Sequence, residues 1–210
     1  MMLARKFEPI IVDLPLREIY SRLGYVKGKT QLSDKQQKQL DAYLSQAESL
    51  VELKGSAIKF EINRIKGSEI ILAGKIILNS NSLAKLLSNS SQVLLIGATS
   101  GSEIIKAIET NSSNNGDMTQ AVVFDAVASE MTDAALDWMV NFFNNTLRRE
   151  NKILTKRRFS AGYGDFGIEN QKLFFEVLNL KQLGVEITDN FLLVPEKSVT
   201  AIAGIQQITA

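Results

Sequence analysis

The stretch from Arg158 to Asp165 (RFSAGYGD) brings together residue types that can hold a small polar ligand. Arg158 carries a planar guanidinium that can pair with a carboxylate. Gly162 and Gly164 flank Tyr163, and glycine allows unusual backbone angles and the close approach of a ligand to the main chain. Tyr163 adds a flat face with a polar tip. This set suits a small, zwitterionic ligand that bears a ring, although an ordinary loop with an exposed tyrosine has the same pattern.

A long helical pattern precedes this stretch. It runs from Met118 to about Leu147 and has a possible interruption near Phe124. Asp133 and Asp137 are four residues apart and therefore share one side of such a helix. A pair of carboxylates like this can hold a metal or a ligand cation, but more often it forms a solvated edge.

Composition excludes several classes of function. Of the 210 residues, 45% are hydrophobic and 22% are charged, which is enough for a sizeable core in one large domain or two small ones. The net charge of +1 gives no overall field that favours nucleic acid or membrane. The chain has no cysteine and no histidine, which excludes disulfides, thiol nucleophiles, Cys/His zinc sites and histidine acid–base catalysis. It has no secretory signal and no apolar run of transmembrane length, so we expect a cytoplasmic protein.

The remaining patterns predict alternating runs of strands and helices. The expected strands and extended segments cover residues 7–13, 57–62, 70–72, 76–78, 92–96, 191–194 and 198–205. The expected helices cover 16–23, 34–53, 102–108 and 169–178, together with a short helix that Asn81 or Ser82 caps and that ends at Leu87. Helices that come in runs between hairpin strands favour an α+β fold over a regular βαβ series.

One motif suggests a nucleotide site. Leu94–Gly101 (LLIGATSG) resembles the first strand and turn of short-chain dehydrogenases, where backbone N–H groups can hold a phosphate. The third glycine is missing, and the Tyr-x-x-x-Lys at Tyr25 and Lys29 precedes the glycines, which is the wrong order. A plain strand-to-helix turn is the simpler interpretation.

A set of short motifs spans almost the whole chain in a characteristic order. The motifs are Ile19–Tyr25 (IYSRLGY), Gly97–Gly101 (GATSG), Asp125–Ser129 (DAVAS), Arg158–Asp165, Gly184–Thr188 (GVEIT), Pro195–Val199 (PEKSV) and Ala201–Ile205 (AIAGI). Each is weak alone, but together they resemble the C-terminal reactivation (activation) domain of cobalamin-dependent methionine synthase, in a stand-alone form. The resemblance implies a single domain over residues 1–210, with a mostly antiparallel sheet and flanking helices.

The resemblance also implies a function. The protein would bind S-adenosylmethionine and act in trans on a methionine synthase that lacks its own activation domain, or on a related corrinoid protein. Cobalamin would be carried by that partner, and inactive cob(II)alamin would receive an electron from a flavodoxin or ferredoxin and then the methyl group. The protein would be a component of methyltransferase reactivation in methionine biosynthesis, with no nucleic acid, no membrane partner and no metal of its own.

The resemblance assigns roles to particular residues. The implied ligand-binding residues are Asp133, Arg158, Ser160, Gly162, Tyr163 and Gly164. Arg158 would pair with the ligand carboxylate, Asp133 would take a hydroxyl or the ammonium group, and Tyr163, the candidate catalytic residue, would guide the methyl group at the corrin-facing edge.

The sequence differs from the usual pattern of this family at several positions. Asp133 stands where the family usually has glutamate, Ala161 where proline is usual, and Glu150 is out of register with a second acid. These departures leave a second hypothesis open, in which the protein is a docking module that caps a corrinoid protein without binding S-adenosylmethionine.

Overall fold

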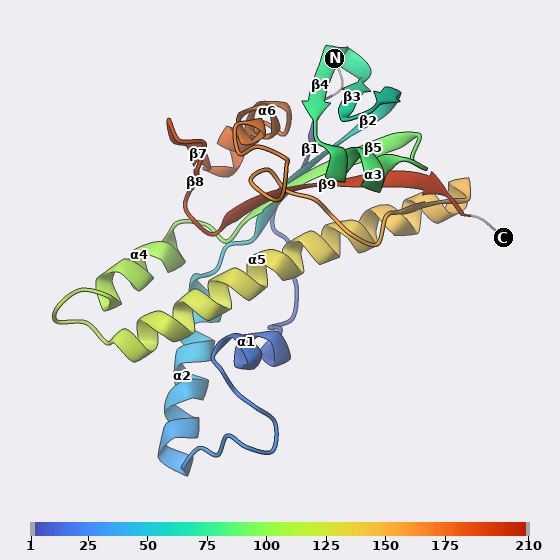
Figure 1. The fold of residues 1–210 in the computed structure, drawn as a ribbon. Helices are drawn as coiled ribbons and strands as arrows, with labels where there is room; N and C mark the ends of the chain where they lie inside the picture. Colours follow the sequence, from blue (N-terminus) through green and yellow to red (C-terminus); the bar gives the residue numbers. More distant parts are fainter. Residues whose placement is uncertain (1–2, 209–210) are drawn as a thin grey trace.

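The computed structural model describes residues 3–208 (Figure 1). The α-helices are α1 (Leu16–Arg22), α2 (Asp34–Leu50), α3 (Asn81–Leu87), α4 (Glu103–Asn111), α5 (Met118–Leu147) and α6 (Asn170–Val177). The strands are β1 (Arg5–Phe7), β2 (Lys54–Lys66), β3 (Glu69–Leu72), β4 (Ile76–Asn79), β5 (Gln92–Thr99), β6 (Lys152–Leu154), β7 (Glu186–Ile187), β8 (Leu193–Val194) and β9 (Ser198–Gln207). Short 3₁₀ helices are η1 (Ala73–Lys75), η2 (Arg148–Glu150) and η3 (Leu180–Leu183).

The main sheet has the strand order β4-β3-β2-β5-β9-β6, and β1 adds to β2. Strands β7 and β8 form a separate small hairpin. Throughout the described residues the strands pair in antiparallel fashion. β5 pairs along its whole length with β2 on one side and with β9 on the other, so its backbone groups are satisfied by both neighbours. The predicted α+β fold with a mostly antiparallel sheet is confirmed.

The central strand divides the hydrophobic core in two. Leu94, Ile96 and Ala98 on β5 pack with residues of α2 and α5, whereas Val93 and Leu95 pack with residues of α3 and α6. Successive side chains of a strand point to opposite faces of the sheet. The apolar run of β5 is therefore buried on both faces, as its composition predicts, and each fully buried leucine contributes roughly 1.5–3 kcal/mol to stability.

The long helix α5 crosses one face of the sheet and extends beyond it toward α2 and α4 (Figure 1). It begins after Asp117, whose carboxylate accepts hydrogen bonds from the backbone N–H groups of Thr119 and Gln120. The helix continues to Leu147 without the interruption considered near Phe124, because the Phe124 side chain is fully buried in the core under the helix. With this side anchored, α5 exposes its other side to solvent.

Several expected boundaries were wrong. Ser80, rather than Asn81 or Ser82, caps α3, since its hydroxyl accepts a hydrogen bond from the Leu83 N–H. α2 ends at Leu50, and the extended segment 7–13 is strand only as far as Phe7.

Two further differences arise from local backbone requirements. Phe191, expected in a strand, has a left-handed φ of 63° in the turn between β7 and β8. The short strand β6 escaped sequence analysis because it has only three residues and gains its partners from β9 at the other end of the chain.

No helix among residues 3–208 combines the length and the apolar composition that crossing a membrane requires.

Candidate ligand-binding site

The exposed side of α5 carries a row of carboxylates. Glu130, Asp133 and Asp137 are spaced three and four residues apart, which places them along one side of the helix. Asp133 is an exposed residue, yet partial desolvation raises the pKa of its carboxyl, and repulsion from Glu130 raises it further. The positive charge of Arg158 opposes these two effects, so Asp133 and Arg158 lie close enough to interact electrostatically.

Arg158 pairs directly with the helix. Its Nη1 donates a hydrogen bond to Asp137 Oδ1, and the two groups form an ion pair. The Arg158 side chain is 25% exposed and that of Asp137 is 68% exposed, so the pair lies at the surface with the arginine as its more buried member. The predicted proximity of Arg158 to the acidic side of the helix is thus present, but the partner in the ligand-free protein is Asp137.

A hollow of about 560 Å³ lies between α5 and the segment that precedes α1. We call it the acidic hollow, because its lining includes the carboxylates of Asp13, Glu18, Glu130, Asp133 and Asp137. Trp138 adds an aromatic wall. Such a set of carboxylates attracts a cationic group, and an aromatic face beside it favours the same charge.

Asp13 is a member of this site that its local sequence does not reveal. It interrupts a short apolar run before Pro15, and nothing in its local sequence places it next to Asp133, which is 120 positions away in the chain. The fold brings it there because the chain runs past α5 on its way from β1 to α1 (Figure 1). In the described part of the chain no three His, Cys, Asp or Glu side chains are arranged to hold a metal ion.

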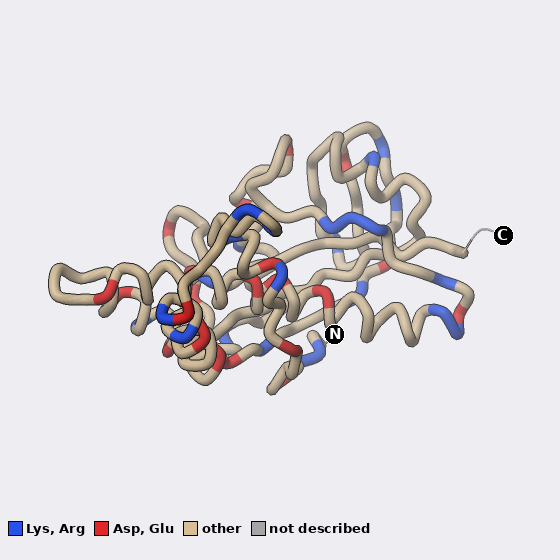
Figure 2. Tube along the Cα trace, turned by 90° about the horizontal axis from the view of Figure 1, so that it is seen from below, with Lys and Arg blue, Asp and Glu red and all other residues tan. Residues whose placement is uncertain are grey.

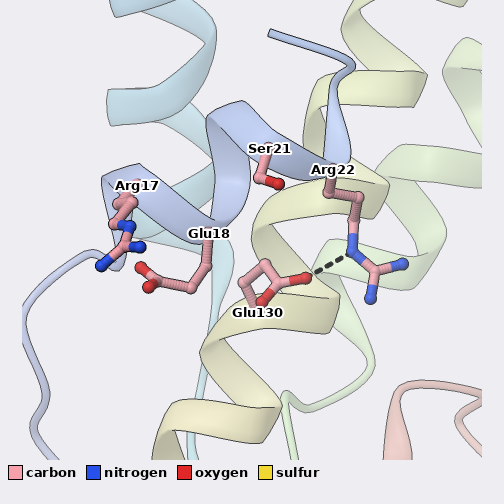
Figure 3. Close-up of a pocket in the computed structure, with 5 residues that line it drawn as sticks. All are labelled: Arg17, Glu18, Ser21, Arg22 and Glu130. Carbon is pink, nitrogen blue, oxygen red and sulfur yellow. Dashed lines mark hydrogen bonds and ion pairs between the residues drawn. The ribbon is translucent and has the colours of Figure 1, made fainter. Parts of the chain in front are cut away.

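A second hollow, lined by charges of both signs, adjoins the acidic hollow between α1 and α5. Its lining includes Arg17, Ser21 and Arg22 from α1, and it shares Glu18 and Glu130 with the acidic hollow (Figure 3). Arg22 Nε donates to Glu130 Oε1 at 2.6 Å, which ties α1 to α5.

The Gly-Tyr loop (residues 158–165) extends the sheet and then turns sharply. Phe159 bridges to Ile202, with reciprocal backbone hydrogen bonds of 2.9 and 2.8 Å. Gly162 then donates to the Phe166 carbonyl at 2.8 Å, with a left-handed φ of 88° that favours glycine. Gly164 has a φ of 56°. The loop is therefore held by its own backbone bonds, and it presents Tyr163 at its tip, 68% exposed.

Asp165 anchors the far end of this loop to α3. Its carboxylate accepts hydrogen bonds from the Ser80 hydroxyl at 2.7 Å and from the backbone N–H groups of Asn81 and Ser82 at 2.6 and 3.3 Å. These donors hold the pKa of Asp165 far below its usual range. Ala161 and Phe166 are buried on either side of the tip. The loop is thus fixed at both ends although Ala161 stands where the resembling family usually has proline.

A third hollow, of about 390 Å³, lies beside the Gly-Tyr loop, and we call it the loop hollow. Ser160, Ala161 and Tyr163 form one wall, and residues of the β7–β8 hairpin and of β9 form the others. The lining is mainly apolar. Gly162 and Gly164 do not line it, and their left-handed φ angles shape the turn that carries Tyr163.

The segment 158–160 lies between the acidic hollow and the loop hollow. Arg158 and Ser160 flank Phe159, whose backbone bridges to Ile202. Arg158 contacts the rim of the acidic hollow through Asp137, and Ser160 lines the loop hollow. Arg158 also ends the run 156–158, which is the longest uninterrupted blue segment of the trace (Figure 2).

The glycine motif at residues 97–101 forms no nucleotide site. Gly97 lies inside β5 between two antiparallel neighbours, and a Cβ atom there would come within 3.0 Å of the Leu180 side chain. A dinucleotide site of the dehydrogenase kind needs a parallel strand that leads into a helix. The glycine instead permits close packing of η3 on the sheet.

Comparison with solved structures identifies a known protein domain with a similar fold. No protein-family profile and no curated protein matches the sequence. Among solved structures, the chain is similar to a crystal structure of the MetH reactivation domain bound to AdoHcy, with a TM-score of 0.68 and 14% sequence identity. The similarity covers 99% of this chain and 79% of that one. The fold that the sequence motifs suggested is therefore confirmed: this chain has the α+β fold of the methionine synthase reactivation domain.

Proposed function

We propose that the protein binds S-adenosylmethionine at the junction of the acidic hollow and the Gly-Tyr loop. The observation that carries the proposal is the convergence of Arg158 with the carboxylates of α5 beside a loop whose backbone is fixed in place. The structurally similar MetH domain was crystallised with AdoHcy, the product that remains when S-adenosylmethionine has lost its methyl group.

The charges of the site suit this ligand. S-adenosylmethionine carries a positive sulfonium, a positive ammonium and a negative carboxylate. Asp133 and Asp13 can receive the cationic groups, because both line the acidic hollow. Arg158 can receive the carboxylate through its planar fork once it exchanges Asp137 for the ligand. The ligand would thus replace one ion pair with another at little electrostatic cost.

We further propose that the bound ligand serves a corrinoid partner in trans. The partner is a cobalamin-dependent methionine synthase without its own reactivation domain, and a flavodoxin or ferredoxin supplies one electron. The electron would reduce the partner's cob(II)alamin to cob(I)alamin, whose cobalt would supply the electron pair for its bond to the methyl group, while the sulfur would keep the pair of the broken bond, which leaves AdoHcy. No proton moves, so the task of this protein is positioning, which can lower a barrier by several kcal/mol. The absence of histidine and cysteine is compatible with that task.

A second candidate function is docking without a ligand. The apolar side chains of Tyr163, Leu192 and Val194 are exposed near the loop hollow, as expected of a surface that meets another protein. The pairing of Arg158 with Asp137 would then be structural.

Calorimetric titration with S-adenosylmethionine and with AdoHcy separates the two functions. For the first, the wild type binds both ligands saturably, and Arg158→Met weakens binding about tenfold or more, as expected for the loss of a charge-assisted pair. Arg64→Met is the matched control, since Arg64 pairs with Glu69 on the distant β2–β3 hairpin. If neither ligand binds while a corrinoid partner still does, the second function holds.

A trans assay tests the partner. A methionine synthase truncated before its reactivation domain, oxidised to cob(II)alamin and mixed with reduced flavodoxin, should regain methylcobalamin absorbance when this protein and S-adenosylmethionine are added. The Arg158→Met variant should not support the recovery. Recovery without this protein, or none with it, contradicts the proposal.

A further inference from the structure

A fourth hollow, of about 630 Å³, lies between α1, the loop that follows it and the start of α2, and we call it the α1–α2 hollow. These elements lie at the opposite end of the molecule from β3 and β4 (Figure 1). The hollow shares no lining residue with the acidic hollow or with the loop hollow. A ligand held there is therefore separate from the S-adenosylmethionine site proposed above.

The charges that line this hollow have one sign. Arg17 and Lys27 line it, and no aspartate or glutamate within residues 3–208 does. In the same part of the chain neither cation forms an ion pair. Glu18, next to Arg17 in α1, lines the two hollows on α5 instead. Two positive charges at one hollow repel each other, and such a hollow concentrates ions of the opposite sign.

The hydroxyl groups of the lining are also available as donors. The Tyr20 hydroxyl accepts a hydrogen bond from Gln37 Nε2 at 3.2 Å, and the Thr30 hydroxyl accepts one from the Val26 N–H at 3.0 Å. Each oxygen acts as acceptor in these bonds, so its own proton is free to be donated. The Ser21 hydroxyl lies in the same lining. The α1–α2 hollow thus offers cations and hydroxyl donors together, which is the combination that binds an oxyanion.

The remaining walls are aromatic and apolar. The rings of Tyr20 and Tyr25 meet edge to face with their centroids 4.9 Å apart, and the Tyr25 N–H donates to the Tyr20 carbonyl at 2.9 Å. These contacts fix the loop against α1. Val26, an exposed apolar residue, lines the hollow beside them. A flat or apolar group attached to the anion would therefore be shielded from water by these walls.

We propose that the α1–α2 hollow binds a small phosphate monoester whose organic part is a ring. At pH 7 a phosphate monoester carries a charge of about −1.5 to −2 and has three acceptor oxygens, which matches two cations and several hydroxyl donors. Arginine binds phosphate through its planar fork, and lysine binds it as a point charge. A carboxylate has only one negative charge and would leave one of the two cations uncompensated.

Calorimetric titration at low salt with three probes tests the class of ligand. Phenyl phosphate has both the phosphate and the ring, inorganic phosphate lacks the ring, and benzoate has the ring with a single negative charge. Phenyl phosphate should bind saturably and about fivefold or more tightly than either of the others, because it alone uses both the cations and the apolar walls.

Substitutions in the hollow identify the binding groups. Arg17→Gln should weaken phenyl phosphate about tenfold or more, and Lys27→Gln about threefold to tenfold, as expected for charge-assisted contacts. Lys29→Gln is the matched control. Lys29 is exposed in the same loop but does not line the hollow, so its replacement removes the same charge and should leave the affinity nearly unchanged.

The melting temperature of the ligand-free protein separates binding from folding. Because Arg17 and Lys27 lack ion-pair partners within residues 3–208, both substitutions should leave this temperature unchanged or raise it slightly. Phenyl phosphate should raise the melting temperature of the wild type more than that of either variant.

Four results would overturn the proposal. The wild type does not bind phenyl phosphate at low salt, or Lys29→Gln weakens binding as much as Arg17→Gln does, which indicates general charge attraction. Inorganic phosphate binds as tightly as phenyl phosphate, which excludes the ring from the site. Benzoate binds as tightly as phenyl phosphate, which excludes the phosphate. Each of these results leaves the proposed S-adenosylmethionine site untouched, because the two sites share no lining residue.

Discussion

Arg158 and Asp137 form an ion pair that links the Gly-Tyr loop to the long helix α5. The pair neutralises the arginine that the ligand carboxylate would need. It also keeps the guanidinium at the rim of the acidic hollow, next to Asp133. The guanidinium proposed to bind the ligand carboxylate is thus in place but already paired with a carboxylate of the protein itself.

This pairing makes Asp137 a competitor of the ligand. Asp137→Asn should free the guanidinium and remove a negative charge that repels the ligand carboxylate, so AdoHcy should bind about threefold to tenfold more tightly. Calorimetry at low and at moderate salt checks this. The difference in AdoHcy affinity between Asp137→Asn and the wild type should shrink at the higher salt concentration, because salt screens the exposed charge. A loss of affinity as large as that of Arg158→Met would mean instead that Asp137 orients the arginine for the ligand.

Asp133 should affect stability in a defined pH range. Desolvation and the nearby Glu130 raise its pKa above the ordinary value of 3.8. A carboxyl whose pKa is raised on folding favours the folded state below its ordinary pKa, and this contribution is lost as pH rises through the raised value. Urea unfolding of the wild type should therefore show a decline in stability upward from about pH 3.8 that Asp133→Asn lacks. Parallel pH profiles for the two proteins would contradict this.

Asp165 should have the opposite pH signature. Its bonds to Ser80 and to the N–H groups of Asn81 and Ser82 lower its pKa, so its contribution is present above its ordinary pKa of 3.8 and is lost as pH falls below that value. Thermal melts should show that Asp165→Asn reduces the acid sensitivity of stability. The same variant should weaken AdoHcy binding at neutral pH, because the loop loses an anchor. Unchanged affinity would show that the loop holds its shape without the carboxylate.

Gly162 should matter for the ligand beyond its effect on folding. An alanine at φ 88° is strained by roughly 1–2 kcal/mol, and its Cβ would lie 3.0 Å from Ile168 Cδ1. Gly162→Ala should lower both the melting temperature and the affinity for AdoHcy.

Gly74→Ala is the matched control for that change. Gly74 has a φ of 79° and open space around it in η1. Its replacement should lower the melting temperature by a similar strain and leave affinity unchanged. Equal effects of both variants on affinity would assign the role of Gly162 to stability alone.

Much of the fold follows from local sequence patterns. The apolar run of β5, the long periodic stretch of α5 and the turn at Gly67 are each encoded within a few neighbouring residues, and the structure contains all of them. β6 could not be foreseen, because three residues acquire strand geometry only through pairing with β9. The cap of α3 was misplaced by one residue, since Ser80, Asn81 and Ser82 are all good capping types and tertiary contacts with Asp165 decide among them.

The site was partly visible in the sequence. The i, i+4 spacing of Asp133 and Asp137 predicts that they share one face of the helix, and the glycines around Tyr163 predict a turn. Asp13 could not be found this way. It reaches the acidic hollow through the path of the backbone in three dimensions, and no local pattern distinguishes it from an ordinary surface residue.

The most direct test of the account is a crystal structure of the protein with AdoHcy. The account predicts the amino-acid end of the ligand beside Arg158 and Asp133, with the Arg158–Asp137 pair opened. Crystals grown at saturating AdoHcy that show Arg158 still paired with Asp137, with the ligand elsewhere or absent, would contradict it.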